Sequence, residues 1–94
     1  MIVVASDGVL DNLFDHDILN CIRKSYTPHS TQSPQEKETS SPPYAQASNC
    51  IARTAETKSF QRDYDSPFAQ NARLAGRNHP GGKKDDITVV VGEV

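Results

Sequence analysis

Two short runs of β-branched residues lie at opposite ends of the chain, and they are the two strands that the sequence predicts. Ile2 to Ala5 is followed by Ser-Asp-Gly, and Ile87 to Val91 is preceded by two glycines, two lysines and two aspartates. Apolar runs of this length, bounded by turn residues, are typical of buried strands. Both faces of the second run are mostly apolar, so we expect both to be covered in a layered structure.

Three helices are predicted between these strands. Apolar residues recur at three- and four-residue spacing in about 15–26, where Asp15 is the expected cap, and in about 44–58. A third helix begins after Ser66, which is followed by a proline suited to the first helical position, and Gly76 ends it. The predicted fold class is therefore α+β.

The segment 27–43 differs in composition from the rest of the chain. Its 17 residues include seven Ser or Thr and four Pro, and none is suited to a hydrophobic core. We expect a disordered insert between two helices, with a regulatory role through phosphorylation as the alternative. The two cysteines, Cys21 and Cys50, each lie beside an isoleucine in a predicted helix, and we expect buried free thiols rather than a disulfide.

Length and charge exclude several classes of protein. The chain has 94 residues, with 10 Lys and Arg against 12 Asp and Glu and a net charge of -2. This length allows one domain, which we expect to be monomeric. No run of like charge indicates a nucleic-acid partner, and no apolar stretch approaches the roughly 20 residues of a transmembrane helix. Four basic residues form a modest cluster, which is either a solvated surface or an attraction for phosphorylated protein: Arg73, Arg77, Lys83 and Lys84.

Acidic residues adjoin both predicted strands. Asp7 follows the first strand, and Asp85 and Asp86 precede the last. If the strands pair antiparallel, these carboxylates converge at one edge of the sheet, where a hard cation such as Mg²⁺ or Mn²⁺ would offset their repulsion. Taken alone, the spacing favours the simpler alternative, in which Asp7-Gly8 forms a turn and the other two aspartates are solvated loop residues.

Three motifs in order resemble the type 2C, metal-dependent protein serine/threonine phosphatases. The segment Ala5-Ser6-Asp7-Gly8-Val9-Leu10-Asp11-Asn12 resembles one signature of that family, and Gly81-Gly82-Lys83-Lys84-Asp85-Asp86-Ile87-Thr88-Val89-Val90-Val91 resembles its closing signature. Ser66-Pro67-Phe68-Ala69, together with Pro80-Gly81-Gly82-Lys83, is similar to the branch found in mitochondria and plastids. The resemblance covers nearly the whole chain outside 27–43, and it favours a metal site over a turn and a solvated loop.

The resemblance implies a site for two Mg²⁺ or Mn²⁺ ions at one end of a four-layer α-β-β-α sandwich. Asp7 and Asp85 would be metal ligands, and Gly8 would let the backbone approach the site closely. Asp86 stands where relatives carry Asn or Asp, so it would lie next to the ligands rather than be one of them. A water activated between the ions would hydrolyse phosphoserine or phosphothreonine in a protein substrate, without a phosphoenzyme.

The chain also departs from the family pattern. The first half of the family's domain supplies an Asp ligand, an Asp-Gly-x-Gly motif and a basic phosphate-binding residue, and nothing in residues 1–94 replaces them. We therefore expect the chain to be the carboxy-terminal segment of one phosphatase domain, inactive when isolated. The alternative is a truncated product that acts as a protein-interaction module without catalysis. The branch resemblance implies a mitochondrial location, with the cytoplasm as the alternative.

Overall fold

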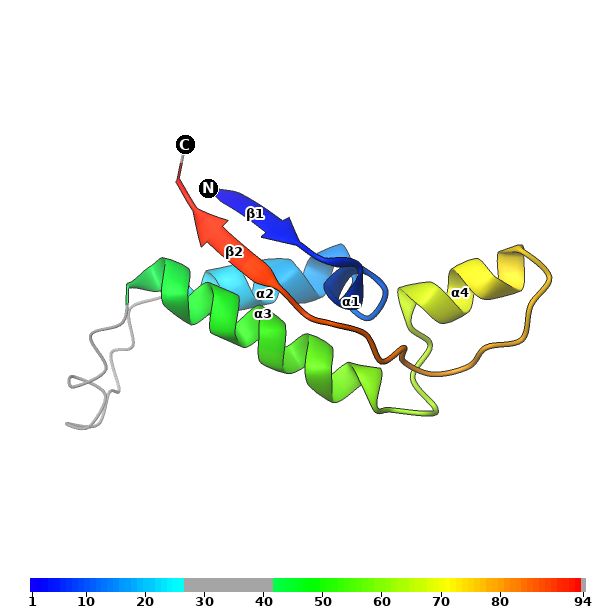
Figure 1. The fold of residues 1–94 in the computed structure, drawn as a ribbon. Coiled ribbons are helices and arrows are strands. Elements are labelled where there is room, and N and C mark those ends of the chain that lie inside the picture. The colour runs from blue at the N-terminus through cyan, green and yellow to red at the C-terminus, as the bar shows by residue number, and fades with distance from the viewer. Residues whose placement is uncertain (27–41, 94) are drawn as a thin grey trace.

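A computed structural model describes residues 1–26 and 42–93 of the chain (Figure 1). Its elements follow in the order β1 (Ile2–Ala5), α1 (Asp7–Leu10), α2 (Asp15–Tyr26), α3 (Pro43–Ser59), α4 (Pro67–Leu74) and β2 (Val89–Gly92). The disorder predicted for 27–43 concerns mainly 27–41, which lie outside the described residues, while Pro43 is the first residue of α3. Within the described ranges, no helix is long and apolar enough to span a membrane.

The two strands pair antiparallel, so the two ends of the chain form one small sheet. The register joins Ile2 to Gly92 and Ala5 to Val89. The last strand begins two residues later than predicted. At Thr88 a serine side chain joins the pairing, because the Thr88 N–H donates to the Ser6 hydroxyl oxygen at 3.0 Å and the Ser6 N–H donates to the Thr88 carbonyl at 3.0 Å.

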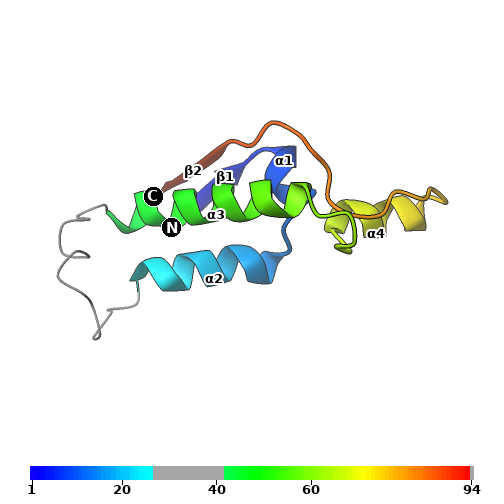
Figure 2. The ribbon, with the colours of Figure 1, turned by 90° about the horizontal axis from the view of Figure 1, so that it is seen from below.

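Helices cover one face of this sheet. Figure 2 shows α3 beneath the strands and α2 on the far side of α3. The buried core lies between these layers and consists of Val9, Leu13, Cys21, Ile51 and Ala55, against which Ile87, Val89 and Val91 pack from the sheet side. The other face is open in the described residues, since Val4 is 60% and Val90 59% exposed. The expectation of two covered faces is therefore wrong here. The α+β class is confirmed, and the four-layer sandwich stays a prediction.

Local side-chain contacts fix the ends of the helices. Asp15 is the first residue of α2 rather than its cap, and the Asp17 carboxylate accepts the Phe14 N–H at 2.9 Å instead. At α4 the predicted start is confirmed, because the Ser66 hydroxyl oxygen accepts the Ala69 N–H at 3.0 Å. Gly76 follows this helix with a φ of 78°, as expected for a residue that ends it.

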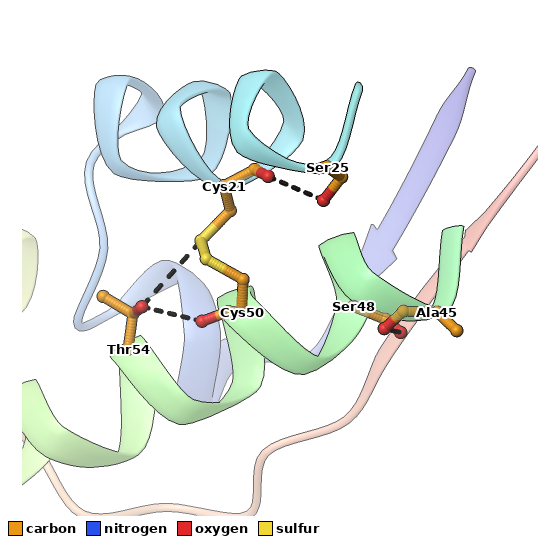
Figure 3. Close-up of a disulfide and its surroundings, with 6 residues drawn as sticks. All are labelled: Cys21, Ser25, Ala45, Ser48, Cys50 and Thr54. Atoms are coloured by element: carbon orange, nitrogen blue, oxygen red, sulfur yellow. Dashed lines mark hydrogen bonds between the residues drawn. A yellow bond between two sulfur atoms is a disulfide. The ribbon is translucent and has the colours of Figure 1, made fainter. Parts of the chain in front are cut away.

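A disulfide joins α2 to α3, and the prediction of two free thiols is wrong. Cys21 and Cys50 form the bridge, with their Cα atoms 5.5 Å apart. Figure 3 shows the bridge beside Thr54, whose hydroxyl donates to the Cys50 carbonyl at 2.7 Å and lies 3.8 Å from the Cys21 sulfur. The bond spans the interface between the two long helices, so it fixes α2 on α3 and thereby supports the layer beneath the sheet.

Candidate functional site

The site predicted from the sequence lies where β1 ends and the approach to β2 begins. Ser6 links the two segments, because its hydroxyl donates to the Asp86 carbonyl at 3.0 Å while its oxygen accepts the Thr88 N–H. α1 starts at the next residue, Asp7. The Asp7-Gly8 pair therefore opens a short helix instead of forming a turn, and it does so beside the segment that carries Asp85 and Asp86.

Gly8 permits the closest backbone approach at this edge. A Cβ atom at Gly8 would lie 2.2 Å from the Asp86 carbonyl oxygen and 3.1 Å from a side-chain carbon of Ile87. Backbone atoms cannot retreat as a flexible side chain can, so any larger residue would force the two segments apart. Gly8 and Asp86 are thus in direct contact through the backbone, and the requirement for glycine is steric.

The buried side-chain amide of Asn12 also holds the α1 segment and the segment before β2 together. The Asn12 side chain is 0% exposed. Its Nδ2 donates to the carbonyls of Gly8 at 2.8 Å and Lys83 at 2.7 Å, and its Oδ1 accepts the Lys83 N–H at 2.8 Å. The Tyr64 hydroxyl donates to the Asn12 carbonyl at 2.9 Å. These bonds fix the backbone at Lys83, two residues before Asp85, and so restrict the position of the Asp85 backbone.

Two neighbouring carboxylates act on Asp11. Burial raises the pKa of Asp11, Lys83 lowers it, and the charges of Asp7 and Asp85 raise it further. Both predicted ligands therefore lie within electrostatic reach of Asp11. Lys83 offsets part of the repulsion, with its Nζ 3.8 Å from Asp11 Oδ2. Asp85 is oriented in turn by the Asp86 N–H, which donates to its Oδ1 at 2.8 Å.

The donor atoms at this edge are of the type that a hard cation binds, but only two candidate ligands supply them. Asp7 and Asp85 are exposed and offer carboxylate oxygens, the ligands that Mg²⁺ and Mn²⁺ prefer over nitrogen or sulfur. Among the described residues, no three His, Cys, Asp or Glu side chains are grouped closely enough to hold a metal ion. The two predicted ligands could therefore contribute to a metal site that needs further oxygen ligands.

Sequence reasoning missed two of the side chains that organise this edge. Asn12 and Asp11 stand in the quoted motif, but their roles depend on burial and on distant contacts that spacing does not reveal. A polar Asp-Asn pair next to a buried apolar run is the only signal that the sequence offers. The predicted basic cluster is also divided, because Arg73 forms an exposed ion pair with Asp65 at 2.6 Å while Lys83 faces Asp11.

Known proteins match this chain over nearly its whole length. A "Probable protein phosphatase 2C 26" of Arabidopsis thaliana is 32% identical over 105 residues, which cover 100% of the chain and 30% of that protein. The human "Protein phosphatase PTC7 homolog" is 35% identical over 91 residues, covering 97% of the chain and 26% of its own length. The X-ray structure of the photosystem II phosphatase PBCP superposes with a TM-score of 0.69 and 30% identity over 98% of the chain and 34% of that protein.

The chain is a relative of the type 2C protein phosphatases. It resembles their carboxy-terminal part, and the PTC7 homologs among its relatives represent the branch indicated by the sequence. No protein-family model matches it. The chain spans about 30% of the Arabidopsis relative, so the activity of the whole phosphatases is not transferred to it by similarity alone.

Proposed function

We propose that this chain supplies one side of the metal site of a protein serine/threonine phosphatase of type 2C, and that it is the carboxy-terminal segment of such a domain. The observation that carries the proposal is the contact between its two signature segments. Ser6 and Gly8 contact Asp86 directly, and Asp7 and Asp85 each lie next in sequence to a residue of this contact. The names of the relatives support the reaction class.

Within this proposal, Asp7 and Asp85 hold the cation and the neighbouring residues keep them in place. Gly8 and Asp86 contribute through their backbone contact, and Asn12 fixes the segment that leads to Asp85. When bound, divalent Mg²⁺ or Mn²⁺ lowers the pKa of a coordinated water and offsets the charge that develops on the phosphoryl group. The remaining ligands would come from the part of the domain that the matched region of the relatives does not include.

A chimeric phosphatase tests this proposal. The matched region of the Arabidopsis relative is replaced by this chain, and hydrolysis of a phosphoserine peptide is measured with Mn²⁺. We expect Mn²⁺-dependent phosphate release that falls at least about a hundredfold in Asp7→Asn or Asp85→Asn, as for loss of a metal-site group. Asp63→Asn is the matched control, because Asp63 is exposed and lies outside the site. An active chimera that is insensitive to both site substitutions would refute the assignment.

The isolated chain provides a second measurement. Two carboxylates hold a hydrated divalent ion only weakly, so we expect calorimetric titration with Mn²⁺ to show no tight site and the chain to release no phosphate from the peptide. Two tight Mn²⁺ sites, or turnover that Asp7→Asn abolishes, would contradict the expected division of ligands. If the chimera is inactive and the chain binds no Mn²⁺ at all, the non-catalytic interaction module becomes the better interpretation.

Substrate and location follow from the same proposal. The substrate would be a phosphorylated protein, and the chain would act as a monomer. A mitochondrial location rests on the resemblance to that branch, and fluorescence microscopy of the tagged gene product tests it against the cytoplasm. A cytoplasmic signal would remove the location from the proposal without affecting the chemistry.

A further inference from the structure

A groove with basic walls lies next to the candidate site. It has a volume of about 530 Å³ and separates the end of α3 from the segment that leads into β2. Arg62 and Phe60 line it from the α3 side, and His79, Lys83 and Lys84 line it from the other side. Lys84 directly precedes Asp85, so one end of the groove adjoins the edge where the carboxylates gather.

The two walls are fixed to each other by backbone contacts. The Gly82 N–H donates to the Gln61 carbonyl at 2.8 Å, and the buried Ser66 hydroxyl donates to the Gly81 carbonyl at 2.6 Å. Gly81 has a φ of 86°, and a Cβ at Gly82 would lie 2.0 Å from the Lys58 carbonyl oxygen. The segments meet too closely to slide past one another, so the groove exists before any ligand arrives.

Aromatic rings orient the lysines. The Lys84 Nζ lies 4.8 Å from the centre of the Phe60 ring, and the Lys83 Nζ lies 4.6 Å from that of Phe68. Such cation–π contacts hold an ammonium group without neutralising its charge. The charge at Lys84 therefore has a defined position and remains available to an anion, whereas that of Lys83 is shared with Asp11.

The groove is positive although the chain is slightly acidic. Its lining includes Arg62, Lys83 and Lys84, and none of the described residues that line it is Asp or Glu. The chain as a whole has a net charge of -2. The positive charge is thus local to this groove, which favours a short anionic segment over an extended polyanion.

We propose that this groove binds the anionic residues that flank the phosphorylated residue of a peptide substrate. The proposal rests on the phosphatase function proposed above and specifies its substrates as phosphoproteins with acidic or additionally phosphorylated flanks. Carboxylates and phosphoryl groups share the chemistry that arginine and lysine recognise. A substrate whose phosphoryl group lies near Asp7 and Asp85 would extend its flanking residues along Lys84 toward Arg62.

Fluorescence anisotropy with the full chain tests the groove directly, in EDTA so that divalent cations make no contribution. The probes are labelled phosphoserine peptides flanked by glutamates, by glutamines or by a second phosphoserine. We expect the glutamate or the second-phosphoserine peptide to bind more tightly than the glutamine peptide, and the two arms distinguish which anion is preferred. Each of Lys84→Gln and Arg62→Gln should weaken that binding about fivefold, as for a partly exposed charge pair.

Arg53→Gln is the matched control, because it removes the same charge from an exposed position on α3 outside the groove. Equal binding of all three peptides, or an equal loss in Arg53→Gln, would overturn the proposal. Tighter, groove-dependent binding of oligothymidylate would overturn it in favour of a nucleic-acid partner.

The outcome is separable from that of the chimera. An inactive chimera leaves a positive anisotropy result unchanged. An active chimera that hydrolyses the glutamate and glutamine peptides at the same rate refutes the groove but not the phosphatase.

Discussion

Replacing Asn12 by aspartate tests whether one buried amide holds the α1 segment against the segment before β2. The two side chains have nearly the same shape, but aspartate cannot donate to the carbonyls of Gly8 and Lys83, which now lie 2.8 and 2.7 Å from Nδ2. Each carbonyl left facing a carboxylate oxygen in a buried site costs about 1–3 kcal/mol. We therefore expect the free energy of unfolding to fall by about 4 kcal/mol, out of roughly 5–14 kcal/mol for a chain of this length.

Urea unfolding followed by circular dichroism measures this loss, with the exposed Asn71→Asp as the matched control. Asn12→Ala also removes the acceptor of the Lys83 N–H, so it should accelerate hydrogen exchange at that amide. If the free energies of unfolding of Asn12→Asp and Asn71→Asp differ by less than about 0.5 kcal/mol, the amide does not hold these segments together, and the reasoning is wrong.

Three further predictions concern other contacts. Gly8→Ala should destabilise the chain by about 3 kcal/mol in urea because its Cβ would lie 2.2 Å from a backbone oxygen, whereas Gly92→Ala, with no atom within 4 Å, should change little; equal effects would refute the steric argument. Reduction of the Cys21–Cys50 bridge, with a sequence separation of 29, should lower the free energy of unfolding by about 3.5 kcal/mol, and coincident urea curves with and without reductant would contradict this. Burial raises the pKa of Tyr64 from 10.0 to about 12, so the protonated phenol stabilises the fold below pH 10 and this stabilisation is lost as the pH rises toward 12. Tyr64→Phe should flatten that part of the pH–stability curve, and an unchanged slope would count against it.

The strands and long helices could be predicted because their patterns are local. Each strand is a run rich in β-branched residues, and α3 repeats apolar residues at four-residue spacing. α1 could not be found in this way, because four residues contain no helical period. The start of β2 was also misjudged, since it depends on the Ser6 hydroxyl, which lies 82 residues away from its partner Thr88.

The sequence could predict only the part of the candidate site that follows from the pairing of the two strands. Antiparallel pairing of the chain ends is confirmed, and it brings the segment of Asp7 beside the segment that leads to β2, while the roles of Asp7 and Asp85 as metal ligands stay a prediction. The disulfide was missed for a physical reason. A cysteine count says nothing about geometry, and Cys21 and Cys50 come within bonding distance only because α2 and α3 lie side by side.

The link between α2 and α3 also has a topological consequence. Any single peptide bond cut between residues 21 and 50 leaves both products joined through sulfur, because the bridge closes that stretch into a ring. A nicked molecule would migrate as one species on a non-reducing gel and separate into two pieces only after a thiol is added. Limited proteolysis with and without reductant therefore reports whether a cut falls inside the ring or outside it.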